Sequence, residues 1–136
     1  MKAILIDPEI REVKYVYLPR EERFARHAMC EIIGCNGMDY AAVSDMHDSI
    51  WVDEHGLLRM QPIHAFKLSI QADPFAGKAI IVGADHNTGA SKTPYVPIDM
   101  IQRDVQWLGL ILPEVTTVQE PEKGEGATRS YSRPRP

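Results

Sequence analysis

Histidine and acidic residues gather on both sides of a short apolar segment, residues 50–52. The group consists of His47, Asp48, Asp53, Glu54 and His55. Imidazole and carboxylate side chains can hold a metal ion or act as general acid and base, so one interpretation is a small metal-dependent hydrolase. The competing interpretation is a solvated turn, because Asp residues followed by Gly56 suit a turn for backbone reasons alone. We favour the turn, and predict that Glu54 and His55 contact a ligand or partner from an exposed hairpin tip.

A second candidate site is the glycine-containing segment 83–93, which follows an apolar run. It is not a Walker phosphate loop, because two residues separate Gly89 from Lys92, whereas that motif needs glycine and lysine adjacent. A loop of this kind can still hold an anion through backbone N–H groups and basic side chains. We favour a plain mobile loop over an anion site. If a small anionic ligand binds, we expect His86, Lys92 and Thr93 to contact it.

The two cysteines, Cys30 and Cys35, lie five positions apart near an expected helix end. A disulfide between them would close a very short loop and add little stability, and no second Cys/His pair stands at zinc-finger spacing. We expect two free, mostly buried thiols, which suits the reducing cytosol. No nucleophile motif surrounds either residue, and Gly-x-Ser-x-Gly does not occur. Our preferred interpretation therefore includes no catalytic residue, no metal ion and no cofactor.

The amino-acid composition argues against some classes of protein. The chain has 136 residues, enough for one domain, and 15 Lys+Arg against 19 Asp+Glu give a net charge of -4. A general nucleic-acid-binding domain would be basic, so nucleic acid is expected at most as a weak partner of the arginines near the C-terminus. Since no apolar run approaches the ~20 residues of a membrane span, no membrane partner is expected.

Hydrophobic patterning predicts the elements that would position these residues. An opening hairpin is expected from residues 3–6 and 13–18, a helix over 20–33 ended by Gly34, and a central strand over 79–82. Other strands are expected at 40–43, 50–52, 57–59 and 65–70. The second and third of these would form a hairpin in which Gly56 takes a positive φ.

A second helix is predicted from Asp99 to the residue before Pro113. Its buried positions would be Ile101, Val105, Leu108 and Leu112. Asp99 and Gln102 would form a capping box, and Asp99 and Arg103 an i,i+4 ion pair. Residues 113–136 are rich in Pro, Gly and charge, which predicts a disordered tail. The expected fold class is α+β: one domain over residues 1–112, with a mostly antiparallel sheet of about five to seven strands and two packed helices.

Several motifs occur in a characteristic order along this domain. They are the opening Lys-Ala-Ile-Leu-Ile-Asp-Pro, the segment Ile32-Ile33-Gly34-Cys35, the run from Ile50 to Leu58, and the run from Phe75 to Gly83. Together they resemble a small family from phages, plasmids and bacteria known only as domain of unknown function 3846. The resemblance covers about residues 1–112 and supplies no activity, ligand or catalytic residue. It implies an accessory protein of a phage or mobile element.

These observations lead to one preferred function and two alternatives. We expect a small, non-enzymatic cytosolic protein that binds a host protein, as in counter-defence, or a small anionic ligand. The alternatives are the metal-dependent hydrolase and a nucleic-acid-associated protein that uses its C-terminal arginines. Self-pairing of an exposed strand edge would make any of them a homo-oligomer.

Overall fold

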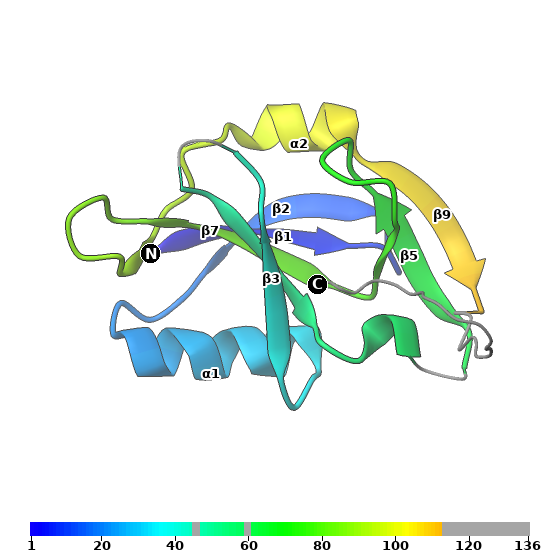
Figure 1. Cartoon of the computed structure of the whole chain (residues 1–136), viewed down its shortest axis with the longest axis horizontal. Helices are drawn as coiled ribbons and strands as arrows, with labels where there is room; N and C mark the ends of the chain where they lie inside the picture. Colours follow the sequence, from blue (N-terminus) through cyan, green and yellow to red (C-terminus); the bar gives the residue numbers. More distant parts are fainter. Residues whose placement is uncertain (45–46, 59–60, 113–136) are drawn as a thin grey trace, which may run out of the picture.

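A computed structural model of the chain describes residues 1–44, 47–58 and 61–112. These residues form two β-sheets and two α-helices (Figure 1), and every strand pairing among them is antiparallel. The expected α+β class and mostly antiparallel sheet are confirmed. The predicted tail, 113–136, lies outside the described residues.

The strands divide between a sheet of six and a sheet of three. The larger sheet has the order β2-β1-β7-β4-β3, with β8 paired to β7. Its strands are β1 (Lys2–Asp7), β2 (Glu12–Tyr17), β3 (Met38–Ala42), β4 (Ser49–Asp53), β7 (Ala79–Ala84) and β8 (Ser91–Lys92). The smaller sheet has the order β6-β5-β9, with β5 (Ile63–Lys67), β6 (Phe75–Ala76) and β9 (Gln106–Ile111).

The centre of the larger sheet is built from the most apolar runs of the chain. β1 and β2 pair along their full length, from Lys2 opposite Tyr17 to Asp7 opposite Glu12, which confirms the opening hairpin. β7 lies between β1 and β4, and its residues 79–83 are buried. An apolar run without polar alternation is typical of a strand covered on both faces, so the predicted central strand is confirmed as well.

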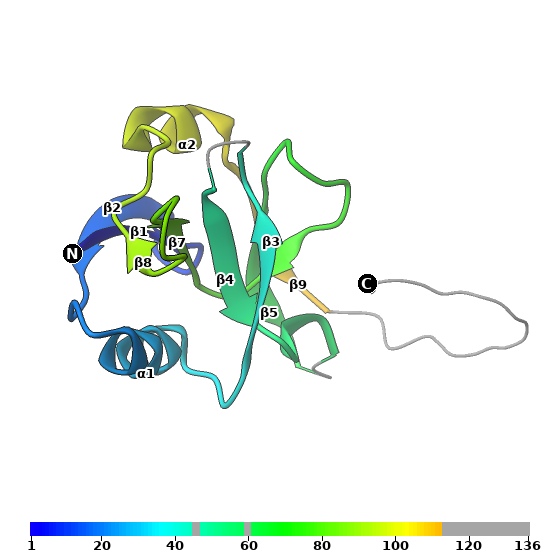
Figure 2. The same cartoon turned by 60° about the vertical axis from the view of Figure 1, so that its left-hand side comes forward.

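The two faces of this sheet are covered differently. Figures 1 and 2 show the helices α1 (Glu22–Ile33) and α2 (Ile98–Asp104) on opposite sides of β1 and β7. Under α1 lies a core of Ala3, Leu5, Leu18, Ala25, Met29, Trp51, Ile80 and Val82. On the other face, α2 and the smaller sheet enclose Ile4, Ile6, Ile50, Phe66, Leu68, Phe75, Ala79, Ile81 and Ile101. Alternate residues of each central strand therefore serve two separate cores.

Helix α1 ends as predicted and begins two residues later than predicted. Glu21 is extended and precedes the first helical residue, Glu22, whose carboxylate suits the positive end of the helix dipole. Gly34 has φ +80° and donates its N–H to Cys30 O at 2.8 Å, a left-handed helix end that glycine adopts without strain. Ala25 and Met29 are its buried contacts with the sheet.

The second helix is shorter than predicted, and its expected second half is a strand. α2 has only seven residues, and β9 follows and pairs with β5. Gly109 in β9 has φ +73°, a conformation that no α-helix contains. The predicted capping box is also wrong, since Gln102 donates instead to Val13 O at 3.1 Å. The predicted pair of Asp99 and Arg103 is present, with a 3.0 Å contact.

The expected hairpin after residue 53 is wrong. β4 pairs with β3 and β7, and residues Gly56–Leu58 form one turn of 3₁₀ helix rather than a strand. Gly56 does not have a positive φ. Its role is close packing, because a Cβ at this position would lie 3.1 Å from the carbonyl oxygen of Ala76.

Candidate functional site

Two loops far apart in the sequence are joined by one buried carboxylate. Asp48, only 1% exposed, accepts the backbone N–H groups of Tyr95 and Val96, each at 2.8 Å, and the hydroxyl of Ser44 at 3.1 Å. A carboxylate can be buried at acceptable cost when hydrogen-bond donors surround it in this way. Asp48 therefore holds the loop before β4 against the segment before α2. It is a structural residue, not the acid or base that the sequence offered as one interpretation.

Aromatic and basic side chains meet where these loops join. The rings of His47 and His86 lie 4.6 Å apart between centroids, and those of His86 and Tyr95 lie 5.2 Å apart. Lys92 places its Nζ 4.8 Å from the centre of the Tyr95 ring. We call His47, His86, Lys92 and Tyr95 the loop cluster. His47 has φ +69°, a left-handed conformation that turns the chain just before β4.

The loop cluster contains two predicted residues, which both lie beside the Tyr95 ring, and two others. His86 and Lys92 were expected to act together. Their neighbours His47 and Tyr95 were not assigned to this site, and Tyr95 lies two residues beyond the segment 83–93 that the sequence singled out. Thr93, the third predicted residue, is half-buried, and its carbonyl oxygen would lie 2.8 Å from a Cβ at Gly83.

The loop that carries His86 is the connection of a β-hairpin. β7 and β8 pair through Gly83 with Lys92 and Ala84 with Ser91. At the tip, the Asp85 carboxylate accepts the N–H groups of Asn87 and Thr88 at 2.8 and 3.0 Å. These hydrogen bonds, with the nearby charge of Lys92, hold the pKa of Asp85 below its ordinary value.

Glu54 and His55 lie away from the loop cluster. They follow the last residue of β4, whereas His47 and Asp48 precede its first, so the whole strand, roughly 13 Å from its first to its last residue at about 3.3 Å per residue, lies between the two pairs. Glu54 contacts His55 at 3.2 Å, and both side chains are largely exposed. Within residues 1–44, 47–58 and 61–112, no three His, Cys, Asp or Glu side chains come together to hold a metal ion. The five-residue group proposed for a hydrolase is thus divided in two.

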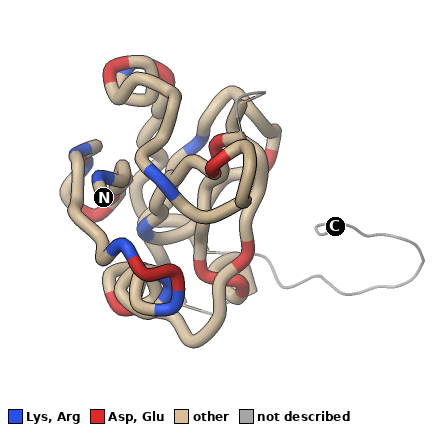
Figure 3. Tube along the Cα trace, turned by 90° about the vertical axis from the view of Figure 1, so that its left-hand side faces the viewer, with Lys and Arg blue, Asp and Glu red and all other residues tan. Residues whose placement is uncertain are grey.

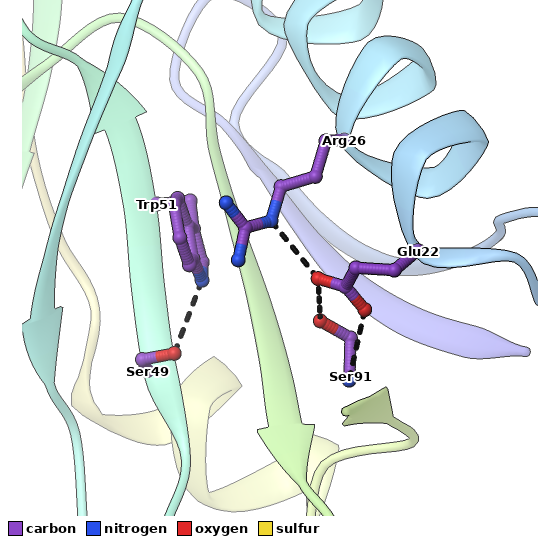
Figure 4. Close-up of polar contacts among 5 residues, drawn as sticks. All are labelled: Glu22, Arg26, Ser49, Trp51 and Ser91. Atoms are coloured by element: carbon purple, nitrogen blue, oxygen red, sulfur yellow. Dashed lines mark hydrogen bonds and ion pairs between the residues drawn. The ribbon is translucent and has the colours of Figure 1, made fainter. Parts of the chain in front are cut away.

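A polar and aromatic array that the sequence did not predict links the same hairpin to α1. Glu22 accepts the backbone N–H and the hydroxyl of Ser91, both at 3.0 Å, and also the Nε–H of Arg26 at 2.9 Å (Figure 4). The Arg26 guanidinium lies 4.5 Å from the ring centre of Trp51. From the neighbouring strand β3, the ring of Tyr40 stacks on the ring of Trp51, with centroids 4.7 Å apart. Helix α1, β8, β4 and β3 are connected through these side chains.

The Glu22 carboxylate titrates under opposing influences. Partial burial would raise its pKa, but hydrogen bonds from Ser91 and Arg26 outweigh burial and hold the pKa below its ordinary value of 4.5. Glu22 is therefore ionised at neutral pH. It fixes the β7–β8 hairpin to the first turn of α1.

A family model described as Domain of unknown function (DUF3846) matches residues 1–105. The chain belongs to this family. The DUF3846 match confirms the resemblance seen in the motifs and includes all four residues of the loop cluster. It ends immediately before β9, so the outer strand of the smaller sheet lies beyond the matched residues. Searches among curated proteins and among solved structures found no match.

Neither helix of the described DUF3846 residues has the length and apolar character needed to cross a membrane.

Proposed function

We propose that this DUF3846 chain is a non-enzymatic binding protein, and that its ligand is a small phosphorylated anion held by the loop cluster. The observation that carries the proposal is the convergence of two imidazole rings, 4.6 Å apart, beside a lysine and a tyrosine from three separate segments. Imidazole N–H, ammonium and phenol groups are all donors to phosphate oxygens.

The charges around the loop cluster favour a small anion-binding site over an extended positively charged surface. On the side of the molecule that carries the β7–β8 hairpin, basic and acidic residues are interspersed (Figure 3). The nearest acid by sequence, Asp85, already accepts two backbone N–H groups. The donors of His47, His86 and Lys92 would therefore supply most of the attraction. This favours a compact anion over a long polyanion such as nucleic acid.

The scaffold supports binding because hydrogen bonds fix the segments that carry the loop cluster. Asp48 fixes the backbone at Tyr95 and Val96, and Glu22 fixes the backbone at Ser91. A site built from fixed segments loses less conformational entropy on binding than a site built from free loops. The bacterial cytosol and a phage or mobile element are the setting we propose, on the basis of the family resemblance.

Isothermal titration with inorganic pyrophosphate tests this proposal, with sodium chloride at equal ionic strength as the blank. The variant His86→Ala/Lys92→Ala should weaken binding by about tenfold or more, as expected for loss of charge-assisted hydrogen bonds. The matched control is His27→Ala/Lys14→Ala, which removes the same two residue types from exposed positions. Circular dichroism checks that both variants fold.

Two results would contradict the proposal. One is pyrophosphate binding to the unchanged protein no better than chloride. The other is an equal loss of affinity in the test and control variants, which would show that only overall charge matters.

A further inference from the structure

The two thiols lie in contact at the end of helix α1. Cys30 is in its last turn and Cys35 is the second residue after it, and their Sγ atoms are 3.1 Å apart. The Cys30 Sγ also lies 2.8 Å from the carbonyl oxygen of Cys35, to which it donates. Both are free thiols. This pair is distinct from the loop cluster and takes no part in the proposed anion site.

The backbone holds the two sulfur atoms at this distance. Cys30 O accepts the N–H of Gly34 at 2.8 Å and the N–H of Cys35 at 3.1 Å, so the helix end closes directly under the pair. Two residues later, Gly37 O accepts the N–H of Glu54 at 3.1 Å, which fixes the following segment to the end of β4. The short spacing of the thiols is therefore a property of the fold and does not depend on the side chains alone.

The pair is also accessible. Both cysteines are half-buried, and they line a surface hollow of about 370 Å³ together with His27, Glu31 and Asn36. Thiol–disulfide exchange requires that an external disulfide reach one sulfur atom. A buried structural cysteine would be inert, whereas these two thiols face an open cavity.

We propose that Cys30 and Cys35 are a redox-active dithiol that closes to an intramolecular disulfide by exchange with oxidised glutathione. In the first step one cysteine, as its thiolate, attacks a sulfur of oxidised glutathione, forms a mixed disulfide and releases one glutathione thiolate. In the second step the other cysteine attacks the protein sulfur of that mixed disulfide and releases the second glutathione. Two protein thiols are oxidised, two glutathione molecules are formed, and the two protein protons pass to the leaving thiolates or to water.

The second step explains why the fold matters. The distance of 3.1 Å leaves the second sulfur almost in contact with the first, so the intramolecular attack has a high effective concentration. Closure requires the sulfur atoms to approach to the disulfide bond length of about 2.05 Å with a Cβ–S–S–Cβ dihedral of about 90°. A mixed disulfide should therefore be short-lived in the unchanged protein and should persist only when one cysteine is missing.

Intact-mass spectrometry of the folded full-length chain tests the proposal. The protein is incubated with oxidised glutathione, quenched in acid, unfolded and alkylated with iodoacetamide. We expect the unchanged protein to lose two hydrogens and to take up no alkyl group, and dithiothreitol to restore two alkylatable thiols. Cys30→Ser and Cys35→Ser should each retain one glutathione, and the double serine variant should not react.

The unchanged protein decides the question even where a serine variant fails to fold. The proposal is overturned if both thiols remain alkylatable after equilibration with oxidised glutathione, or if glutathione adducts accumulate without closure. It is equally overturned if the product is a disulfide between two chains, which non-reducing electrophoresis would separate from the monomer. Pyrophosphate titration of the oxidised protein distinguishes this site from the loop cluster, because closure should leave that affinity unchanged.

Discussion

The Asp48 carboxylate accepts the backbone N–H of Tyr95 at 2.8 Å and joins residues 47 positions apart in the sequence. This bond and its neighbour at Val96 place the ring of Tyr95 beside His86, and His86 beside His47. A single buried residue thus helps to hold the segments that carry the loop cluster together. The sequence offered Asp48 as a reacting group, but its contribution is to position other side chains.

Replacement of Asp48 by alanine should destabilise the protein strongly. The N–H groups of Tyr95 and Val96 would lose their acceptor, which we expect to lower the free energy of unfolding by about 3 kcal/mol. Urea unfolding followed by Trp fluorescence measures this change. Asp99→Ala is the matched control, since its exposed pair with Arg103 should contribute less than about 1 kcal/mol. Similar values for the two variants would contradict the role assigned to Asp48.

Gly83→Ala tests the packing behind the loop cluster. A Cβ at residue 83 would lie 2.8 Å from Thr93 O and 3.1 Å from Asp48 Oδ1, so one of these groups must move. We expect a loss of about 1–3 kcal/mol of stability together with weaker pyrophosphate binding.

Gly34→Ala is the control for this substitution. Gly34 has φ +80° with no atom within 4 Å of an added Cβ, so alanine would strain the backbone without touching the cluster. It should cost roughly 1–2 kcal/mol and leave pyrophosphate affinity unchanged. Unaltered affinity in Gly83→Ala would show that the cluster does not depend on this contact.

Glu22→Gln should alter how stability depends on pH. Because hydrogen bonds from Ser91 and Arg26 keep the pKa of Glu22 below 4.5, its contribution is fully present at neutral pH and is lost as the pH falls below that value. The unchanged protein should therefore be more stable than Glu22→Gln near neutrality, and the difference should shrink in acid. Thermal melts across this range measure it. A constant difference would mean that the carboxylate charge is not involved.

Cys35→Ser and Cys30→Ser should differ in how quickly they acquire glutathione. The pKa of the Cys35 thiol is raised to about 12 by burial, by its hydrogen bond and charge interaction with Cys30, and by the charges of Asp53 and Glu54. Burial and the charges of Asp53 and Glu54 still raise the pKa of Cys35 when Cys30 is replaced, and only the thiolate attacks, so Cys30→Ser should form the mixed disulfide more slowly than Cys35→Ser. Timed acid quenches with mass detection give the two rates. Equal rates would show that neither thiol is favoured for the first attack.

The elements that the sequence predicted are those whose signal is local. β1 and β7 are short apolar runs, and α1 combines a helical apolar face with a glycine at its end, so each could be identified from a few neighbouring residues. β9 could not, because Val105, Leu108 and Leu112 also fit a helical period. Pairing with β5, some forty residues earlier, decided the conformation there.

The residues of the candidate site likewise divide into those with a local sequence signal and those that only the fold brings together. His86 and Lys92 were found because one loop contains both, along with glycine and little apolar content. His47 joins them only through the long-range bonds of Asp48, and Arg26 meets Trp51 only because α1 packs over β4. The spacing of residues along the sequence does not predict a ring-to-ring contact between separate segments. Such a contact emerges from how the strands are ordered in the sheet.

That order also constrains how the chain can acquire its structure. β1 pairs with β7 through Ile4 and Ile81, so β1 can complete its pairing only after residues 79–84 have been synthesised. Non-local pairing of this kind raises contact order, which slows folding to milliseconds or longer in domains dominated by it. During synthesis, β1 and β2 would have no sheet to join until the ribosome had released residue 84. The apolar side chains of β1 would stay exposed for that interval, a stage at which a chaperone can bind.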